Sequence, residues 1–180
     1  MLTVATSEAS PLLGAVWHLY APDHWIEAGF ISPAAPATAW ATFNGEIDGL
    51  VNFLFEPGSI PLATPRSQHF TEAYAKAYGE PARNKLSGHG PGPSYDAVFV
   101  LADAIRRAGS TQADAVVAEL ERTDTQGAIG KIVFNKTHQV IYGEDPTRAA
   151  VSLAFQWRAG KRRLVYPESV ADGAFELPGK

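Results

Sequence analysis

The sequence has 180 residues, of which 46% are hydrophobic and 19% are charged, and its formal net charge is −4. This composition is typical of a folded chain with a buried core and excludes a highly charged disordered chain. The acidic balance predicts no nucleic-acid partner, because it offers no general attraction to phosphates. The absence of cysteine excludes disulfides, thiol catalysis and cysteine-ligated metal. No apolar run reaches membrane-spanning length, and the first residues lack the pattern of a secretion signal peptide.

The N-terminal part of the chain predicts the beginning of a parallel sheet. Residues 11–19 are mostly apolar, which is typical of a buried strand. A short helix is predicted to begin at Pro22-Asp23, with Asp23 as its cap, and to end at Gly29. The segment 31–42 is interrupted by Pro33 and Pro36, and its sequence assigns it no particular element.

The middle of the chain predicts a strand and a helix, followed by a linker. Residues 50–55 are rich in Leu, Val and Phe and predict a second strand. A helix is predicted from Arg66 to Tyr78, where apolar side chains recur along one stripe and Gly79 can end the helix. The segment from Gly79 to Ser94 is rich in glycine and proline and predicts no regular element.

Two helices are predicted next. The first runs from Ser94 to Ala108, with Ser94 as its cap and Gly109 as the residue that closes it. The second follows a cap in the turn Ser110-Thr111 and ends near Arg122. The apolar residues of the first helix recur at three- and four-residue spacing, which places them on one face: Val98, Leu101, Ala102 and Ile105.

Strands dominate the C-terminal part of the sequence. The β-branched run from Lys131 to Phe134 predicts a strand, and Asn135 to His138 predicts a turn. Ala150 to Trp157 and Lys161 to Tyr166 predict two more strands, joined as a hairpin.

Several of these segments carry motifs in a fixed order. The motifs are Ser94-Tyr95-Asp96-Ala97-Val98, Leu101-Ala102-Asp103-Ala104-Ile105, Arg107-Ala108-Gly109-Ser110-Thr111, Leu120-Glu121 with Thr123-Asp124, and Gly127 to Phe134. Together they resemble the second half of the type I periplasmic binding proteins, the branched-chain amino acid (Leu/Ile/Val) substrate-binding proteins of ABC transporters. Phe70 to Gly79 and Phe155-Gln156-Trp157 also resemble a helix and the terminal hairpin of this family.

The resemblance implies an α/β fold and a division into lobes. The fold would be part of the type I periplasmic binding protein fold, a parallel sheet flanked by helices with a C-terminal β-hairpin. Residues 1–90 would belong to the second, C-terminal lobe, residues 91–128 would form a helical pair that packs on the first lobe, and residues 129–180 would return to the second lobe. These 180 residues do not match the family's opening portion, which builds most of the first lobe. The segment 88–93 is a candidate hinge between the lobes.

The residue patterns contain no recognisable catalytic or metal site. His18 and His24 form no known ligand set with Asp23, and the other histidines are scattered. The glycines of residues 88–92 lack the Gly-Lys-Ser/Thr ending of a phosphate-binding loop, and the sequence has no Gly-x-Ser-x-Gly nucleophile motif. We therefore expect no metal, no other cofactor and no catalysis.

The resemblance implies that a small solute binds between the two lobes, and three residues are candidates for that site. Tyr95 begins the helix after the hinge, and its ring either lines the cleft or packs beneath the hinge. Asp23 follows a predicted strand and either binds an ammonium group of the ligand or caps a helix. Tyr20 is either an aromatic residue of the cleft or the end of a strand. The Ser and Thr residues that bind the ligand carboxylate in the family belong to the unmatched first portion.

The implied function is a non-catalytic binding component of an ABC transporter, located in the periplasm or outside the cell. Its ligand would be an amino acid, an amide or a small organic acid, and its partner would be the membrane permease. A ligand-sensing regulatory domain of the same fold is an alternative, and a small α/β hydrolase or transferase is a second one. Without the first lobe, the two central helices should expose apolar faces and favour self-association through them.

Overall fold

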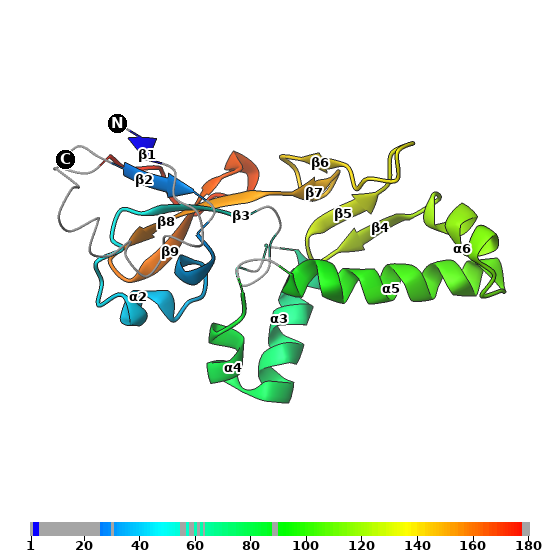
Figure 1. The fold of residues 1–180 in the computed structure, drawn as a ribbon, viewed down its shortest axis with the longest axis horizontal. Helices are drawn as coiled ribbons and strands as arrows, with labels where there is room; N and C mark the ends of the chain where they lie inside the picture. Colours follow the sequence, from blue (N-terminus) through cyan, green and yellow to red (C-terminus); the bar gives the residue numbers. More distant parts are fainter. Residues whose placement is uncertain are drawn as a thin grey trace.

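The computed structural model describes residues 2–3, 26–29, 31–54, 57, 60, 62, 64–87 and 90–177. Its strands form two sheets, one toward each end of an elongated molecule (Figure 1). The strands are β1 (Leu2–Thr3), β2 (Ile26–Gly29), β3 (Val51–Leu54), β4 (Asp124–Gly127), β5 (Gly130–Val133), β6 (Tyr142–Gly143), β7 (Ala150–Val151), β8 (Leu153–Arg158) and β9 (Lys161–Tyr166). The helices are η2 (Ser32–Ala34), α2 (Ala39–Thr42), α3 (Pro65–Tyr78), α4 (Glu80–Asn84), α5 (Pro91–Ala108), α6 (Ala113–Leu120) and η3 (Glu168–Val170). In this described part of the chain, no helix is long and apolar enough to cross a membrane.

The five-stranded sheet has the order β1-β2-β3-β8-β9. Its first three strands are parallel, and β8 and β9 continue it as an antiparallel C-terminal hairpin. A continuous core of buried apolar side chains packs against this sheet, and Trp157 is among its largest members. The Nε1–H of Trp157 donates a hydrogen bond of 2.8 Å to the carbonyl oxygen of Ala34, which fixes η2 to the sheet.

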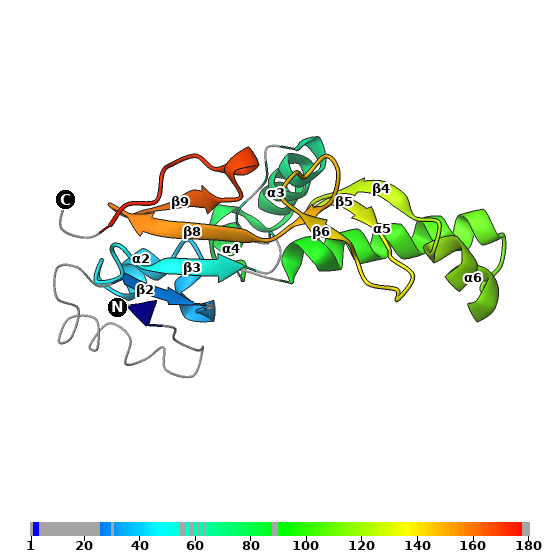
Figure 2. The same cartoon turned by 90° about the horizontal axis from the view of Figure 1, so that it is seen from above.

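The four-stranded sheet, with the order β4-β5-β7-β6, is smaller, and α5 runs along one of its faces (Figures 1 and 2). β4 and β5 form an antiparallel hairpin in which Gly127 lies opposite Gly130. The buried apolar cluster here has four members: Val100, Ile129, Ile132 and Ala150. Ser152 alone separates β7 from β8, so the chain passes directly from this sheet to the five-stranded one.

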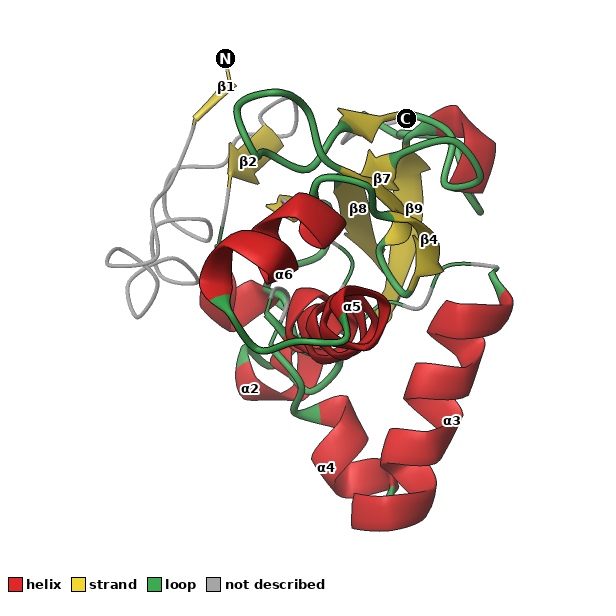
Figure 3. Ribbon diagram, turned by 90° about the vertical axis from the view of Figure 1, so that its right-hand side faces the viewer, coloured by secondary structure: helices red, strands yellow, loops and turns green. Residues whose placement is uncertain are grey.

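Seen from one end, the longer helices lie below most of the strands (Figure 3), whereas the short helix η3 lies against β9. α6 packs beside α5, and α3 and α4 project away from the strands. The observed architecture is therefore the expected α/β arrangement, with sheets flanked by helices and a C-terminal hairpin.

Most elements predicted beyond residue 50 are confirmed. The structure contains the strand β3, the helices α3, α5 and α6, the strand β5 and the hairpin of β8 and β9. α5 ends where Gly109 adopts the left-handed conformation, with φ 58° and ψ 20°, as its glycine predicts. The turn after β5 is also present, because Asn135 Oδ1 accepts hydrogen bonds from the backbone N–H groups of Thr137 and Gln139.

Other predictions are wrong. Residues 26–29 form β2 rather than the end of a helix, because they pair in parallel with β1 and β3. The segment 79–94 contains α4 and the first turn of α5, although no regular element was predicted there, and the unassigned segment 31–42 contains η2 and α2. In η2, α4 and α5 a proline occupies the first turn, where a missing N–H breaks no intrahelical bond. The predicted strand 11–19 lies outside the described residues.

The N-caps predicted for α5 and α6 are also wrong. Gly90, not Ser94, is the N-cap residue of α5, and the Ser94 N–H already donates an intrahelical bond of 2.9 Å to the Gly90 carbonyl oxygen. Gln112 is the N-cap residue of α6 and provides no side-chain cap. Ser110 instead closes the turn before it, since its Oγ accepts a bond of 3.1 Å from the Gln112 N–H.

The apolar face predicted for α5 is not its buried face. Val98 is 66% exposed and Leu101 is 47% exposed. The buried residues of α5 recur every four positions and share the opposite side of the helix: Gly92, Asp96, Val100 and Ala104. The apolar exposure expected for the two central helices is thus observed on α5, and Val117 extends it onto α6.

Candidate functional site

Tyr95 is the one candidate ligand residue that the structure describes, and it lies in the second turn of α5. Its ring packs at 5.0 Å from the Phe70 ring of α3 and at 4.8 Å from the Phe99 ring, measured between centroids. The guanidinium of Arg66 lies 5.3 Å from the same ring. These contacts agree with a packing role between α3 and α5, and the role of Tyr95 in ligand binding stays a prediction. Asp23 and Tyr20 lie outside the described residues.

A groove with a volume of about 360 Å³ opens next to Tyr95, between the first turn of α3, one side of α5 and the strand β4. Arg66 contributes from α3, and Thr125 and Gly127 contribute from β4. The complete lining is Arg66, Asp96, Phe99, Val100, Ala102, Asp103, Arg106, Thr123, Thr125, Gln126, Gly127 and Ile132. The groove therefore combines an apolar floor with polar groups of both charges.

Asp96 forms the buried polar contact between α5 and the β4–β5 turn. Its two carboxylate oxygens accept hydrogen bonds from the backbone N–H groups of Ala128, at 2.8 Å, and Ile129, at 3.1 Å. Burial raises the pKa of the Asp96 carboxyl above its ordinary value, and the two backbone bonds and the charge of Arg66 offset that rise only in part. A side chain at position 127 would place its Cβ 2.5 Å from Asp96 Oδ2, so this close approach requires Gly127.

Two polar atoms at the groove have no hydrogen-bond partner within the part of the chain that the structure describes. They are Nε of Arg66 and Oγ1 of Thr123, and both atoms are buried. Thr123 is only 4% exposed as a residue, and it immediately precedes β4. The Arg66 guanidinium stacks 4.3 Å from the centre of the Phe99 ring, which holds its charge against the apolar floor. The arrangement offers a cation and a hydroxyl to a group that enters the groove.

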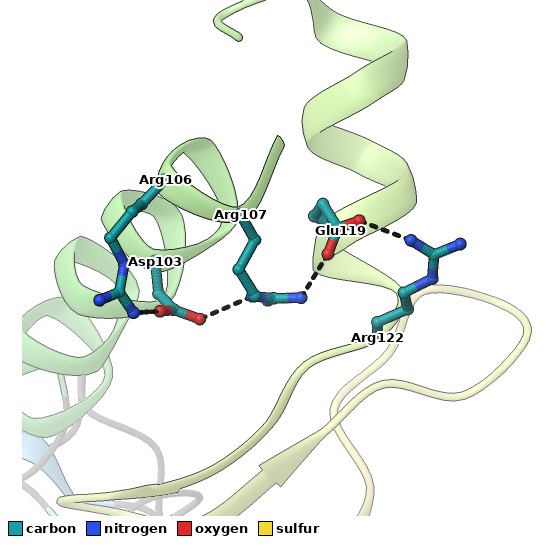
Figure 4. Close-up of polar contacts among 5 residues, drawn as sticks. All are labelled: Asp103, Arg106, Arg107, Glu119 and Arg122. Carbon is teal, nitrogen blue, oxygen red and sulfur yellow. Dashed lines mark hydrogen bonds and ion pairs between the residues drawn. The ribbon is translucent and has the colours of Figure 1, made fainter. Parts of the chain in front are cut away.

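A chain of ion pairs joins α5 to α6 beside the groove (Figure 4). Asp103 accepts hydrogen bonds from Arg106 and Arg107, and the Arg107 Nε lies 2.8 Å from Asp103 Oδ2. These two bonds, of which the Arg106 bond contributes more, hold the pKa of the Asp103 carboxyl below its ordinary value. Arg107 also reaches Glu119 Oε2 of α6 at 2.7 Å, and Arg122 binds the other oxygen of Glu119 at 2.5 Å. The network orients the two helices, and its charges are paired with one another.

The histidines that the structure describes are His69 and His138. The Nε2 of His138 lies 2.9 Å from Glu121 Oε1, at an exposed position. Within the described ranges, no group of three or more His, Cys, Asp or Glu residues could hold a metal ion. The geometry described above thus offers a binding groove between α3, α5 and β4.

The sequence pattern of the family described as "Periplasmic binding protein" matches residues 30–151, which include α3, α5 and the groove. The chain belongs to the periplasmic binding protein family. The resemblance stated from the sequence motifs is therefore confirmed.

Curated relatives of this periplasmic binding protein carry names that refer to branched-chain amino acids. The "Leu/Ile/Val-binding protein homolog 7" of Brucella suis is 31% identical over 115 residues, which make up 64% of this chain and 27% of the relative. Its counterpart in Brucella melitensis is also 31% identical over 115 residues. The match thus covers much less than the full length of these relatives.

Solved structures show the same fold. A putative branched-chain amino acid ABC transporter protein from Silicibacter pomeroyi has a TM-score of 0.75 and 16% identity, and the match covers 99% of this chain and 47% of that chain. A leucine-binding protein from Thermotoga maritima has a TM-score of 0.64 and 18% identity, with 91% of this chain and 42% of that chain covered. The periplasmic binding protein described here therefore spans just under half the length of these structural neighbours.

Sequence reasoning missed the polar residues of the groove. Asp96 was predicted only as part of a family motif, whereas the structure buries it against the β4–β5 turn. The four-residue spacing of Gly92, Asp96, Val100 and Ala104 is the signal that could have shown this buried face. No local sequence signal identified Arg66 and Thr123. These two residues line the same groove only because α3 packs near β4 in the folded chain.

Proposed function

We propose that this chain is the second half of an amino acid-type solute receptor of an ABC transporter. In the complete receptor, the solute would bind between two lobes, and the closed form would present both lobes to the membrane permease in the periplasm. The observation that carries this proposal is the family match over residues 30–151, together with relatives named as Leu/Ile/Val-binding proteins. The members of this family are substrate-binding proteins, and we propose that this chain likewise has no catalytic activity.

The proposed division of the chain assigns residues 1–90 and 129–180 to the second lobe and residues 91–128 to a helical pair that packs on the first. Val98 and Leu101 on this pair are exposed apolar side chains. Their exposure supports the proposal that another polypeptide, the first lobe, covers them in the complete receptor. Tyr95 lies beside the proposed hinge segment 88–93, and we propose that it lines the cleft together with Asp23 and Tyr20. In the absence of the first lobe, we propose that copies of the chain associate weakly through the exposed apolar faces.

A thermal-shift screen tests the solute-binding role. The chain is melted with each amino acid, with amides and small organic acids, and with generic ester substrates whose hydrolysis is followed in parallel. We expect one solute class to raise the melting temperature, because a ligand at 100 times its Kd stabilises the folded state by about 2.7 kcal/mol. Turnover of an ester, or stabilisation by none of the solutes, would contradict the proposal.

A variant pair sharpens the same test. Tyr95→Phe removes only the hydroxyl group at the proposed cleft, and Tyr78→Phe makes the same change at the 68% exposed end of α3. We expect the solute-dependent shift to fall for Tyr95→Phe and to stay unchanged for Tyr78→Phe. Equal shifts for the two variants would exclude a hydrogen bond from the Tyr95 hydroxyl to the solute.

A further inference from the structure

The strand β4 is an open edge of the four-stranded sheet. It stands first in the order β4-β5-β7-β6, and the described residues provide no strand on its outer side. An unpaired edge is a template for pairing with another extended segment. The edge strand β9 of the other sheet carries Lys161 and Arg163, charged residues of the kind that discourage such pairing. The sequence of β4, Asp-Thr-Gln-Gly, has one charged residue, and Asp124 is already paired with Lys131 at 2.9 Å.

The groove lies along this open edge, on the side of the sheet that faces α5. Thr125 and Gly127, two residues apart in β4, both line it. A strand added beside β4 would direct every second side chain toward the same side of the sheet. Those side chains would enter the groove, above Phe99 and Ile132.

The groove also specifies the chemistry of one entering group. The buried Arg66 Nε and Thr123 Oγ1 lack partners within the described ranges, and both groups can donate a hydrogen bond to oxygen. The other groove arginine, Arg106, is already paired with Asp103, and Asp96 is bound by two backbone N–H groups. The uncompensated donors thus favour a carboxylate, which accepts bonds from a guanidinium and a hydroxyl at the same time.

The helix side of the groove has an exposed apolar part. Phe99 lines the groove and is itself 47% exposed, and Ala102, about one turn further along α5, lines the groove as well. An apolar surface beside an open sheet edge fits a polypeptide that continues both the sheet and the core better than it fits a small polar ligand.

The lengths of the structural neighbours indicate which polypeptide this is. This chain covers 47% of the Silicibacter pomeroyi protein, so a further half of that fold lies outside the match. We propose that β4 and the groove dock an extended segment of the remaining half of the receptor, with a carboxylate of that segment against Arg66 and Thr123. The choice of this partner rests on the proposed function, whereas the docking edge and its chemistry rest on the geometry.

A second copy of the chain fits the groove less well. A two-fold symmetric antiparallel pairing of two β4 strands keeps the two α5 helices on the same face of the joined sheet. Asp124 pairs with Lys131, which lies opposite Gln126, whereas Ile132 and Gly127 face α5. The Asp124 of a copy would therefore point away from Arg66 and leave the groove without a carboxylate.

Hydrogen exchange in a chimera tests the docking edge. The part of the Brucella suis relative that precedes its match to this chain is joined to the N-terminus of this chain by a flexible linker, which keeps the two halves at an effective concentration on the order of mM. Exchange at the backbone amides of residues 124–127 is compared in the chimera and in the chain alone, without solute. We expect exchange of the outward amides to slow by about tenfold or more in the chimera.

Three variants test the carboxylate. Arg66→Glu should return the β4 amides to fast exchange, Arg66→Lys should do so in part because it keeps the charge and loses the Nε–H, and Arg163→Glu on β9 should have no effect. Unchanged protection in Arg66→Glu, fast β4 exchange in a folded chimera, or equal protection in the chain alone at high concentration would each overturn the inference. A chimera that protects β4 and binds no solute would instead contradict the proposed function alone.

Discussion

The two sheets of this protein differ in how completely they cover their own apolar surface. The five-stranded sheet has a continuous core that includes Phe155 and Trp157, and η2 and α2 pack against it. Among the described residues, the four-stranded sheet has a cluster of four buried apolar residues, no strand on the outer side of β4, and a covering helix whose outer side exposes Val98 and Leu101. The first region covers its own apolar core, whereas the second leaves apolar side chains and a strand edge uncovered in the described structure, as the proposed function expects.

The largest effect is expected in the five-stranded region. Trp157→Ala removes a fully buried indole that packs edge-on against Phe155 and donates to the Ala34 carbonyl, and it should lower the free energy of unfolding by about 3–5 kcal/mol. Urea denaturation followed by circular dichroism measures the loss. Trp157→Phe serves as the matched control. It should lower the free energy of unfolding by less, because an aromatic ring still fills part of the space. A small loss for Trp157→Ala would show that this core does not carry the stability of the chain.

The second largest effect is expected where α5 is held to the smaller sheet. Asp96→Ala leaves the N–H groups of Ala128 and Ile129 without their acceptor and should cost about 2–4 kcal/mol in the same denaturation experiment. Hydrogen exchange should localise the damage to α5 and the β4–β5 hairpin. Damage spread equally over both sheets would contradict the separation of the two regions.

Asp96 also predicts a smaller contribution to stability that depends on pH. Because its pKa is raised in the folded state, folding favours the protonated form, so its contribution to stability is fully present below about pH 4 and is lost as the pH rises through the raised value. Asp96→Asn is neutral throughout, and the difference in unfolding free energy between wild type and this variant should shrink or reverse between acidic and neutral pH. A difference that is independent of pH would contradict the raised pKa.

The smallest effect is expected on the exposed side of α5. Val98→Ser and Leu101→Ser should change the free energy of unfolding by less than about 0.5 kcal/mol each, because neither side chain is buried in the isolated chain. Val100→Ser, on the buried side of the same helix, is the matched control and should cost several times more. Sedimentation velocity of the double exposed-face variant should also show less self-association. A large loss of stability from Val98→Ser would mean that other residues of this chain already bury the Val98 side chain.

The same contrast explains which features the sequence could predict. Local signals placed α5 and its end at Gly109 correctly, since the glycine at a helix C-terminus acts through its own backbone. They did not identify the buried face of α5, because the spacing of Val98, Leu101 and Ile105 shows that residues share a face and not what that face contacts. Asp96 on the buried side finds its partners 32 and 33 residues further along the chain, beyond the reach of any local pattern.

The candidate site was predictable to a similar extent. The motif that contains Tyr95 and Asp96 indicated the family and the presence of the helix, but not its first turn. It could not show that the groove residues Arg66 and Thr123 approach the same space, because they are brought together by the packing of α3 against β4. The motif also could not show that Arg66 Nε and Thr123 Oγ1 lack hydrogen-bond partners in the described structure. Whether a buried polar atom finds a partner depends on the neighbours that the folded chain places around it.

Isothermal titration calorimetry of the two-half chimera with leucine, isoleucine, valine and the other solutes of the screen tests whether this chain is one half of a solute receptor. We expect one of these solutes to bind with a stoichiometry of one per chimera and to bind at least an order of magnitude more weakly to the chain alone, which would supply only one side of the cleft. A folded chimera that binds no solute, or binds it no more tightly than the chain alone, would contradict the assignment of this chain as one half of a solute receptor.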